Sequence, residues 1–362
     1  AGTYTLTLSG SDENNAVGDL DIWEDLTIDG AGAATTIIDG NGTDRIFEFG
    51  SDSDGSSLSG VTLQNGDAGT GDGGAILTQR ALTISDAELV GNTAKNGGAI
   101  LANDTLTLER VTIDGNSSQN GGGVLINSGS GHSLTNVTLS GNTATSGSGG
   151  GLDIKATATL TNVTIANNSA WANGGGLHNG GFAVTVSNTL IADNTASGSG
   201  NDAFGAFTSD GSNLVEDISG ATGFGGGDIT GVDPNLQALA NDGGEIRVLA
   251  LGGGSAAIDN GDSGSAAIVD ARGFLRGDGS PDIGAYEAGA SVRPVSAAMW
   301  LSTEDVVASG GQPGTDNWNP SDLVGIGDPN LNLGPGTTSG TFSTVFDADG
   351  FSVGWDMNAA HY

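Results

Sequence analysis

The chain has 362 residues, 66 of them glycine, and its 43 acidic residues against 9 Lys and Arg give a formal net charge of −34. This charge argues against nucleic acid and anionic membrane surfaces as partners, because both bind through basic patches. The chain has no cysteine for disulfides or thiolate sites and no apolar run long enough to span a bilayer, so we expect it not to be membrane-spanning.

Residues 1–20 predict an irregular cap on a repetitive domain. Tyr4, Leu6 and Leu8 alternate with other residues, a pattern typical of a strand. The chain begins at Ala1 without an initiator Met, and we interpret it as a mature, bacterial-type chain that is secreted or displayed on the cell surface. Strand-and-turn units follow in residues 21–65, as expected for the atypical end of a solenoid.

The clear repeats occupy residues 73–200. An asparagine closes each repeat, and successive closing asparagines lie 24 or 26 residues apart. A fixed period of this length, built from short strands, indicates a solenoid. A glycine-led apolar strand also returns in each repeat, at residues 74–76, 98–100, 122–124, 150–152 and 175–177.

Each repeat contains two further strand-like pieces. Apolar residues alternate with polar ones at Leu106 and Leu108, and again at Val111 and Ile113. A period of two places one set of side chains inside and the other outside. With the glycine-led strand, each coil therefore has three short parallel strands. The sequence predicts an all-β chain, with a parallel β-helix over residues 1–290 and a small β module or cap in residues 291–362.

The asparagines that close the repeats form the most informative polar row. At a fixed corner of every coil, each would lie above its equivalent, so that side-chain amides can hydrogen-bond along the stack. Asn also tolerates the left-handed conformation of a tight corner. We predict a structural ladder, with a ligand-binding row as the alternative, formed by Asn92, Asn116, Asn142, Asn168 and Asn194.

The period breaks in residues 201–290, where motifs follow in a fixed order: DPNL at 233–236, NDGG at 241–244, SAAIDNG at 255–261, DARGF at 270–274 and DIGAYE at 282–287. This series resembles the carboxy-terminal part of bacterial surface proteins of the choice-of-anchor Q domain type. The repeats are also loosely similar to those of polymorphic outer-membrane autotransporters. The resemblance covers roughly residues 20–290 and implies a right-handed parallel β-helix, exported to the cell surface or beyond and usually without an assigned activity.

The two ends of a coil stack expose unpaired backbone, and such edges invite pairing with another chain. We therefore predict that the chain assembles with itself, end to end or by strand exchange, into an oligomer or fibre. The residues expected to take part are Tyr4 and Leu6 at one end and Phe351, Val353 and Trp355 at the other.

Two Asp-x-Asp-Gly fragments favour Ca²⁺ as a cofactor, because each places two hard oxygen ligands beside a turn. The first fragment contains Asp52 and Asp54, and the second contains Asp347 and Asp349. Both lack the remaining positions of an EF-hand, so an ordinary acidic turn stays open as the alternative for each.

We predict that the chain is not an enzyme. Many parallel β-helices cleave polysaccharides, so a lyase or glycosidase is the alternative. Lys155 is a candidate base, but the catalytic pattern of polygalacturonase-like enzymes is absent, and we expect His132 and His178 to be structural. A non-catalytic glycan-binding module that uses Trp23 or Trp171 is a third interpretation.

The expected function is that of an extracellular structural or adhesive solenoid. Its expected partners are other copies of the chain and cell-surface glycans. The tripeptide Arg276-Gly277-Asp278 matches an integrin-binding motif, and we interpret it as a chance match in a chain rich in Gly and Asp.

Overall fold

The computed structural model describes residues 1–7, 10, 18–277, 280–292, 299–301 and 324–326. The chain divides into two units, Ala1–Val292 and Arg293–Tyr362. In the second unit, β31 (Met299–Leu301) and β32 (Val324–Ile326) form an antiparallel pair. The described part does not include five residues that were predicted to bind calcium or to take part in assembly: Asp347, Asp349, Phe351, Val353 and Trp355.

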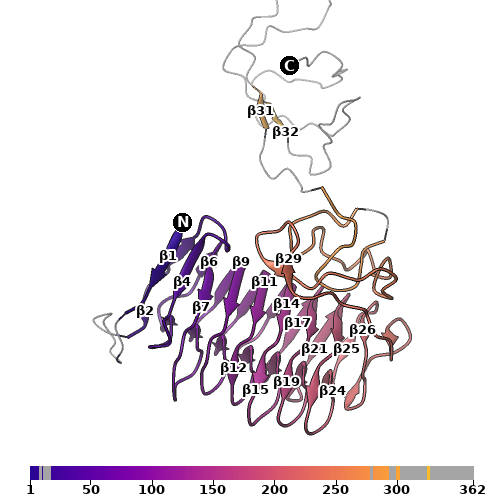
Figure 1. The fold of residues 1–362 in the computed structure, drawn as a ribbon, viewed down its shortest axis with the longest axis horizontal. Coiled ribbons are helices and arrows are strands. Elements are labelled where there is room, and N and C mark those ends of the chain that lie inside the picture. The colour runs from indigo at the N-terminus through magenta and orange to yellow at the C-terminus, as the bar shows by residue number, and fades with distance from the viewer. Residues whose placement is uncertain (8–9, 11–17, 278–279, 293–298, 302–323, 327–362) are drawn as a thin grey trace, which may run out of the picture. The chain divides into compact units, whose positions relative to one another are not determined.

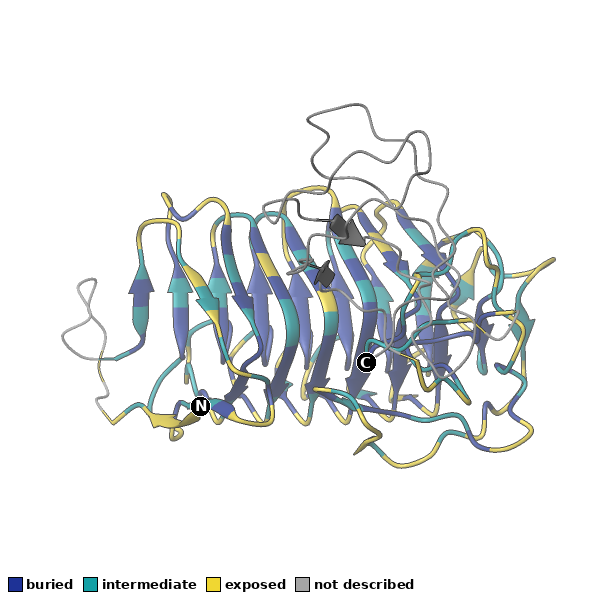
Figure 2. Cartoon of the chain, turned by 90° about the horizontal axis from the view of Figure 1, so that it is seen from above, coloured by how far each residue is buried: buried dark blue, intermediate teal, exposed yellow. Residues whose placement is uncertain are grey.

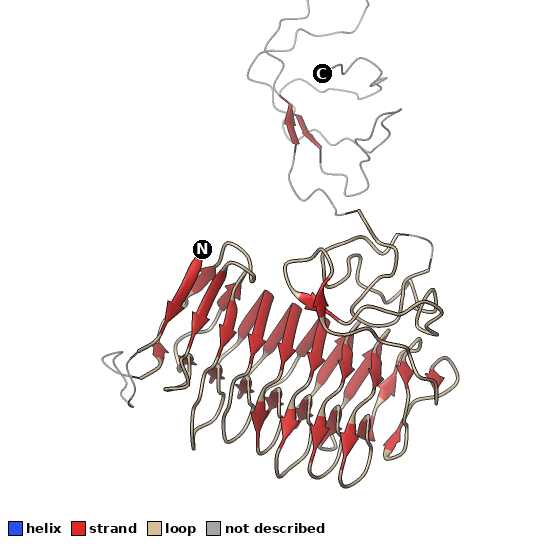
Figure 3. Cartoon of the chain, in the orientation of Figure 1, coloured by secondary structure: helices blue, strands red, loops and turns tan. Residues whose placement is uncertain are grey.

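The first unit is a parallel β-solenoid of about 8 turns (Figure 1). Figure 3 shows strands and loops without any helix in the part of the chain that the structure describes. The prediction of an all-β parallel solenoid is confirmed. Its strands form three sheets that run along the stack, here named sheet 1, sheet 2 and sheet 3.

Sheet 1 has two arms, because each coil bends once within it. The first arm contains β3 (Thr27–Asp29), β6 (Ser56–Ser59), the first parts of β9 (Leu82–Val90), β11 (Leu106–Asp114) and β14 (His132–Ser140), then β17 (Ala158–Thr161), β21 (Val184–Ser187) and β25 (Thr208–Ser209). The second arm contains β1 (Gly2–Thr5), β4 (Thr36–Asp39), β7 (Thr62–Gln64), the second parts of β9, β11 and β14, then β18 (Thr164–Ala166), β22 (Leu190–Ala192), β26 (Leu214–Val215) and β28 (Ile229–Thr230).

Sheets 2 and 3 form the other sides of the coils. Sheet 2 contains β2 (Leu20–Ile22), β5 (Phe47–Phe49), β8 (Ile76–Thr78), β10 (Ile100–Ala102), β13 (Val124–Ile126), β16 (Leu152–Ile154), β20 (Leu177–Asn179), β24 (Ala203–Ala206) and β27 (Ala221–Thr222). Sheet 3 contains β12 (Ser117–Ser118), β15 (Thr143–Ala144), β19 (Ser169–Ala170) and β23 (Thr195–Ala196). Outside the stack, β29 (Ala240–Asn241) and β30 (Arg247–Val248) pair antiparallel.

One apolar core fills the interior of the coils. Figure 2 shows that many residues of the stacked strands are buried. Leu106 and Leu108 are fully buried, whereas Thr107 between them lies on the outer face. The same alternation recurs in the neighbouring coils, so each coil buries its apolar residues partly against the next coil. The hydrophobic effect therefore stabilises the stack as a whole rather than any single coil.

The bend between the two arms of sheet 1 is a single residue in the left-handed conformation. The φ angles of these residues lie between 48° and 55°. Asn and Asp adopt this conformation more readily than other residues with a side chain. We call these residues the bend row: Asp86, Arg110, Asn136, Asn162, Asn188 and Ser212.

Residues 231–292 fold back against the second arm of sheet 1 instead of extending the stack, and we call them the cover segment (Figure 1, orange). Arg247 of the cover segment pairs with Glu88 at 2.8 Å and with Asp114 at 3.0 Å. The bend row also binds it, since Asn136 donates to the Val269 carbonyl at 2.8 Å. The sequence predicts residues 201–290 as the irregular end of the parallel β-helix. In the structure, β24 to β28 continue the coils, and the residues after them form a cover.

Two arginines hold the motifs of the cover segment together. Arg272 pairs with Asp270 at 2.7 Å, and Arg276 pairs with Glu287 at 2.9 Å. All four side chains are almost completely buried. Arg272 also donates to the Glu287 carbonyl at 2.5 Å, and the Glu287 N–H donates to Asp270 Oδ2 at 3.2 Å, so the DARGF and DIGAYE motifs meet in space. The integrin-type tripeptide does not display its arginine, because the Arg276 side chain is only 1% exposed.

The five closing asparagines form a continuous buried ladder. In the last four, the Oδ1 atom accepts hydrogen bonds from the backbone N–H and the Nδ2–H of the asparagine in the preceding coil, at 2.8–3.0 Å. In the first, Asn92, Oδ1 accepts from the Gly66 N–H at 2.8 Å. Each Nδ2 also donates to a carbonyl of the preceding coil, as from Asn142 to Ile113 at 2.9 Å. The ladder thereby satisfies backbone and side-chain groups that the core would otherwise leave unpaired.

The ladder ends on a carboxylate. Asp202 Oδ1 accepts from the Asn194 backbone N–H at 3.1 Å and from its Nδ2 at 2.9 Å. The other oxygen, Oδ2, accepts from the Asp217 N–H at 2.7 Å. Asp202 is 1% exposed, and burial raises its pKa to about 6.

We expect Asp202 to make the rod more stable in mild acid. Because its pKa in the folded chain is raised to about 6 from the usual 3.8, the folded state binds its proton more tightly than the unfolded state. The stability contributed by Asp202 therefore rises as the pH falls through about 6 towards about 4, by up to about 3 kcal/mol.

Denaturation midpoints at about pH 7.5 and about pH 4.5 test this expectation. The Asp202→Asn variant should lack this part of the pH response, although its amide would face the Asp217 N–H and weaken that contact. If wild type and variant respond to pH identically, Asp202 does not titrate as inferred.

Candidate functional site

One outward row of side chains runs along sheet 2. The middle residue of each strand points away from the core, whereas its neighbours, such as Ile100 and Ala102, belong to the core. The strands pair in register, so these middle residues stack in a line. Leucines form the centre of the row and polar clusters lie towards its ends: Asp21, Glu48, Leu77, Leu101, Leu125, Asp153, His178 and Phe204.

The first cluster contains three carboxylates. Asp19, Asp21 and Glu48 each place an oxygen within 4.8 Å of the others, and this group could hold a metal ion. The two aspartates are 5% and 6% exposed. Arg45 already binds the cluster, through Asp19 at 2.6 Å and through a short contact with Glu48. Three carboxylates so close together attract cations, and their hard oxygens suit a divalent metal ion.

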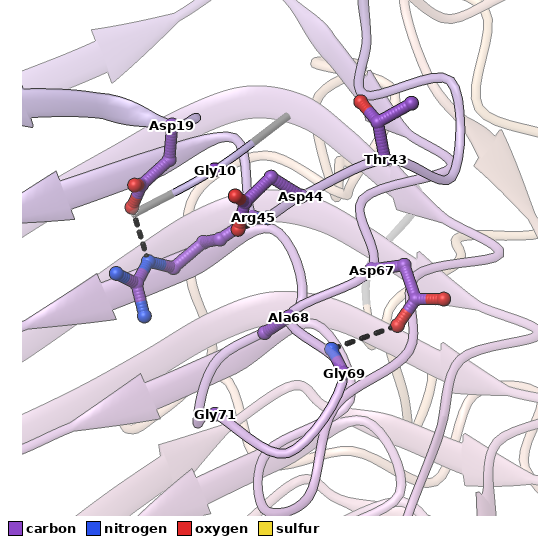
Figure 4. Close-up of a pocket in the computed structure, with 9 residues that line it drawn as sticks. All are labelled: Gly10, Asp19, Thr43, Asp44, Arg45, Asp67, Ala68, Gly69 and Gly71. Carbon is purple, nitrogen blue, oxygen red and sulfur yellow. Dashed lines mark hydrogen bonds and ion pairs between the residues drawn. The ribbon is translucent and has the colours of Figure 1, made fainter. Parts of the chain in front are cut away.

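A pocket of about 490 Å³ lies beside this cluster (Figure 4). Figure 4 shows Arg45 directing its guanidinium towards Asp19. Asp44 and Asp67 also line the pocket, so together with Asp19 its wall carries three carboxylates. Asp67 accepts a hydrogen bond from the Gly69 N–H at 2.9 Å.

The predicted aspartates Asp52 and Asp54 lie elsewhere. Asp54 Oδ1 accepts from the Ala81 N–H of the next coil at 3.4 Å. Among the described residues, the three carboxylates that converge are those of Asp19, Asp21 and Glu48. Calcium binding at Asp52 and Asp54 stays a prediction.

The second cluster is an Asp–His pair. The Nδ1 atom of His178 lies 2.6 Å from Asp153 Oδ1, and the Phe204 ring stacks on the imidazole with centroids 5.6 Å apart. Lys155 lies 3.5 Å from the other Asp153 oxygen. Asp153 is 1% exposed and the His178 side chain 16%. The carboxylate fixes Nδ1 as a donor, which in a neutral ring leaves Nε2 as the acceptor.

His132 is buried inside the coil. Its Nδ1 accepts from the Leu106 N–H at 3.1 Å, so Nε2 is the protonated atom that donates to the Ser128 carbonyl at 3.1 Å. Burial lowers the pKa of this imidazole below 6.5 and favours its neutral form. These contacts fit the structural role that the sequence predicts for His132.

The two exposed tryptophans lie in different coils. Trp23 follows β2 and packs on Gly50, where any Cβ would overlap the ring. Trp171 follows β19 and is 65% exposed. Because several coils separate the two rings, they do not form one binding surface. Each ring could stack only on a sugar of its own.

A two-file array of hydroxyl side chains covers the first arm of sheet 1. The strands pair in register over successive coils, so each file repeats once per coil. One file is Ser57, Thr83, Thr107, Ser133, Thr159 and Thr185. The other is Ser59, Ser85, Glu109, Thr135, Thr161 and Ser187. We call the two files together the hydroxyl array.

The sequence shows the alternation that builds this array, but not that two hydroxyl files lie in register on one arm of a sheet. Ser and Thr on the outer face were interpreted only as the polar half of the strand pattern. The carboxylates at Asp21 and Glu48 were missed for another reason: they lie in irregular coils whose register cannot be read from a fixed period.

Comparisons of the chain with protein-family models, with curated proteins and with solved structures found no match. Within the described residues, no helix is long and apolar enough to cross a membrane.

Proposed function

We propose that this chain is an extracellular structural or adhesive β-solenoid. The observation that carries the proposal is the hydroxyl array, which presents the same kind of side chain at nearly every coil. Repeat proteins use such extended surfaces for binding. A pocket for a small molecule would instead be concave and mainly apolar. A regular face suits a ligand whose own surface repeats.

We expect the purified chain to adsorb to a solid or to a cell surface. Co-sedimentation with whole bacterial cells and with a panel of insoluble glycans measures this adsorption, and a protein-free supernatant in the presence of one surface is the expected result. If the chain stays in solution with every solid tested, the adhesive proposal fails.

The family identity is part of the proposal. We propose that the chain belongs with choice-of-anchor Q type surface proteins, with right-handed coils and a secreted or cell-surface location. The contact between the DARGF and DIGAYE motifs supports this proposal, because it explains physically why the motifs occur together in the sequence. The residues that form this contact are Asp270, Arg272, Arg276 and Glu287.

Self-assembly is proposed from the amino-terminal edge of the stack. In the described residues, β1, β2 and β3 each pair on one side only, and Tyr4 is 56% exposed. A second copy could pair with this edge. Light scattering and electron microscopy, with and without calcium, should show oligomers or fibres. Monomers under both conditions would remove this part of the proposal.

Calcium is the ion we propose for the Asp19, Asp21 and Glu48 cluster, because hard carboxylate oxygens suit it. Calcium at 100 times its Kd should stabilise the first unit by about 2.7 kcal/mol, measured as a rise in Tm. The Glu48→Gln variant should lose this rise, whereas Asp52→Asn should keep it. A rise that disappears only in Asp52→Asn would place the ion at the turn instead.

The Asp153–His178 pair favours a second candidate function. The buried carboxylate of Asp153 orients the His178 imidazole, which could act as a general base. Lys155 would supply a positive charge beside it. A polysaccharide-active enzyme is therefore the alternative proposal. Incubation with acidic and neutral polysaccharides should then release reducing ends or unsaturated products, and His178→Ala should abolish the release.

A further inference from the structure

We propose that the hydroxyl array on the first arm of sheet 1 binds ice. This inference rests on the proposed adhesive function and names the ligand of its carrying surface. Ice is a solid whose surface repeats in two directions, and the hydroxyl array also repeats in two directions.

The spacing of the array is set by the backbone. Along the stack, neighbouring strands lie about 4.8 Å apart, so each file repeats at that distance. Across the stack, the two files come from residues i and i+2 of one strand, such as Thr159 and Thr161, about 6.6 Å apart. Water oxygens on the prism face of hexagonal ice repeat at distances close to these two. The array therefore offers matched positions over several successive coils.

The side chains that form the array suit this ligand. A hydroxyl both donates and accepts hydrogen bonds, as a lattice water does. Threonine adds a methyl group and a restricted χ1, so its hydroxyl is held in few orientations. Contacts along the files restrict them further, since the Thr161 and Ser187 hydroxyl oxygens lie 3.2 Å apart. Adsorption to a crystal gains from such order, because less side-chain entropy is lost on binding.

The charge of the array also fits a neutral solid. The chain carries 43 acidic residues, yet the two files contain a single carboxylate, that of Glu109, and one more, Asp29, adjoins Ser59 at the first coil. Arg110 forms an ion pair with the Glu109 carboxylate. The array is therefore a nearly uncharged face on a protein with a net charge of −34. Such a face is complementary to the neutral surface of ice rather than to a charged polymer.

The cover segment leaves this arm open. Its hydrogen bonds to sheet 1 go to the bend row and to the second arm, as at Asn162, Asn188 and Thr164. In the array itself, Thr83, Glu109 and Thr159 are exposed, and most other members are half-buried. Ser187, in the last coil of the array, is 5% exposed and marks the end of the usable face.

Thermal hysteresis and inhibition of ice recrystallisation by the purified full chain test the inference. We expect both activities in the wild type. A tyrosine at an exposed position of the array, in Thr159→Tyr, should abolish both, because its ring holds the face away from the crystal. Glu109→Thr completes the array and should raise the hysteresis above that of the wild type.

The matched control is Thr195→Tyr, an exposed threonine in sheet 3, outside the array. It should keep full activity, and circular dichroism should show that all variants are folded. Loss of activity in Thr195→Tyr with retention in Thr159→Tyr would overturn the assignment of the array. Absence of hysteresis in the wild type would overturn ice as the ligand. If the wild type then sediments with an insoluble glycan, adhesion survives without ice, and if it binds no solid, both proposals fail.

Discussion

Replacing Asn142 by alanine should lower the free energy of unfolding of the first unit by about 3–5 kcal/mol. Asn142 lies at the middle of the ladder and is fully buried. Its Oδ1 accepts from the Asn116 backbone N–H at 3.0 Å, and its Nδ2 donates to the Ile113 carbonyl at 2.9 Å and to Asn168 Oδ1 at 2.9 Å. Alanine leaves these groups buried without their partners, and each such loss costs about 1–3 kcal/mol.

Asn127→Ala is the matched control. Asn127 also donates an amide hydrogen bond along the stack, to Asn103 Oδ1 at 2.8 Å, but it is exposed to solvent. Water can replace the lost bond there, so the free energy of unfolding should change by no more than about 0.5 kcal/mol. Urea denaturation of both variants measures the difference. Equal effects at the two positions would show that burial does not set the strength of the ladder.

Replacing Arg276 by methionine should release the cover segment and leave the coils folded. The guanidinium of Arg276 pairs with Glu287 at 2.9 Å and donates to the Gly284 carbonyl at 2.7 Å and to Asn136 Oδ1 at 3.1 Å. Without Arg276, the carboxylate of Glu287 is left in the interior without its cation. Removing one member of a buried ion pair costs about 3–5 kcal/mol.

Hydrogen exchange resolved by segment measures this release. In Arg276→Met, amides of residues 231–292 should exchange faster, whereas those of residues 97–170 should keep their protection. The double variant Arg276→Met with Glu287→Leu removes both charges and should restore much of the protection, because an apolar pair can replace a buried ion pair. Faster exchange throughout the coils would instead make the cover segment part of one cooperative unit with the rod.

Local spacing explains why much of the fold could be predicted. The alternation at Leu106, Leu108, Val111 and Ile113 is read within a few residues, and strand geometry converts it directly into an inner and an outer face. The closing asparagines recur at a nearly constant period, so stacking equal coils brings them together. The ladder and the core therefore follow from patterns shorter than one coil or equal to one coil.

The cap of the ladder shows where that reasoning ends. Asp202 accepts from Asn194 although only 8 residues separate them, far less than one repeat. The chain makes a short loop there, and only the folded backbone shows that it returns to the ladder. A carboxylate at that place is physically reasonable, because the donors of Asn194 need an acceptor and the ladder has no further asparagine beyond it.

By itself, the sequence determined the coil: its strands, its buried face and its asparagine corner, because each depends on neighbours in the chain or on a constant repeat. Only the tertiary structure decided which side chains of different coils come into contact, and where the cover segment packs on the coils. The joining of Asp21 with Glu48 and of Asp153 with His178 depends on the register of coils of unequal length. The placing of residues 231–292 on sheet 1 depends on contacts between segments more than 100 residues apart, such as Arg247 with Glu88, a distance at which no local pattern carries information.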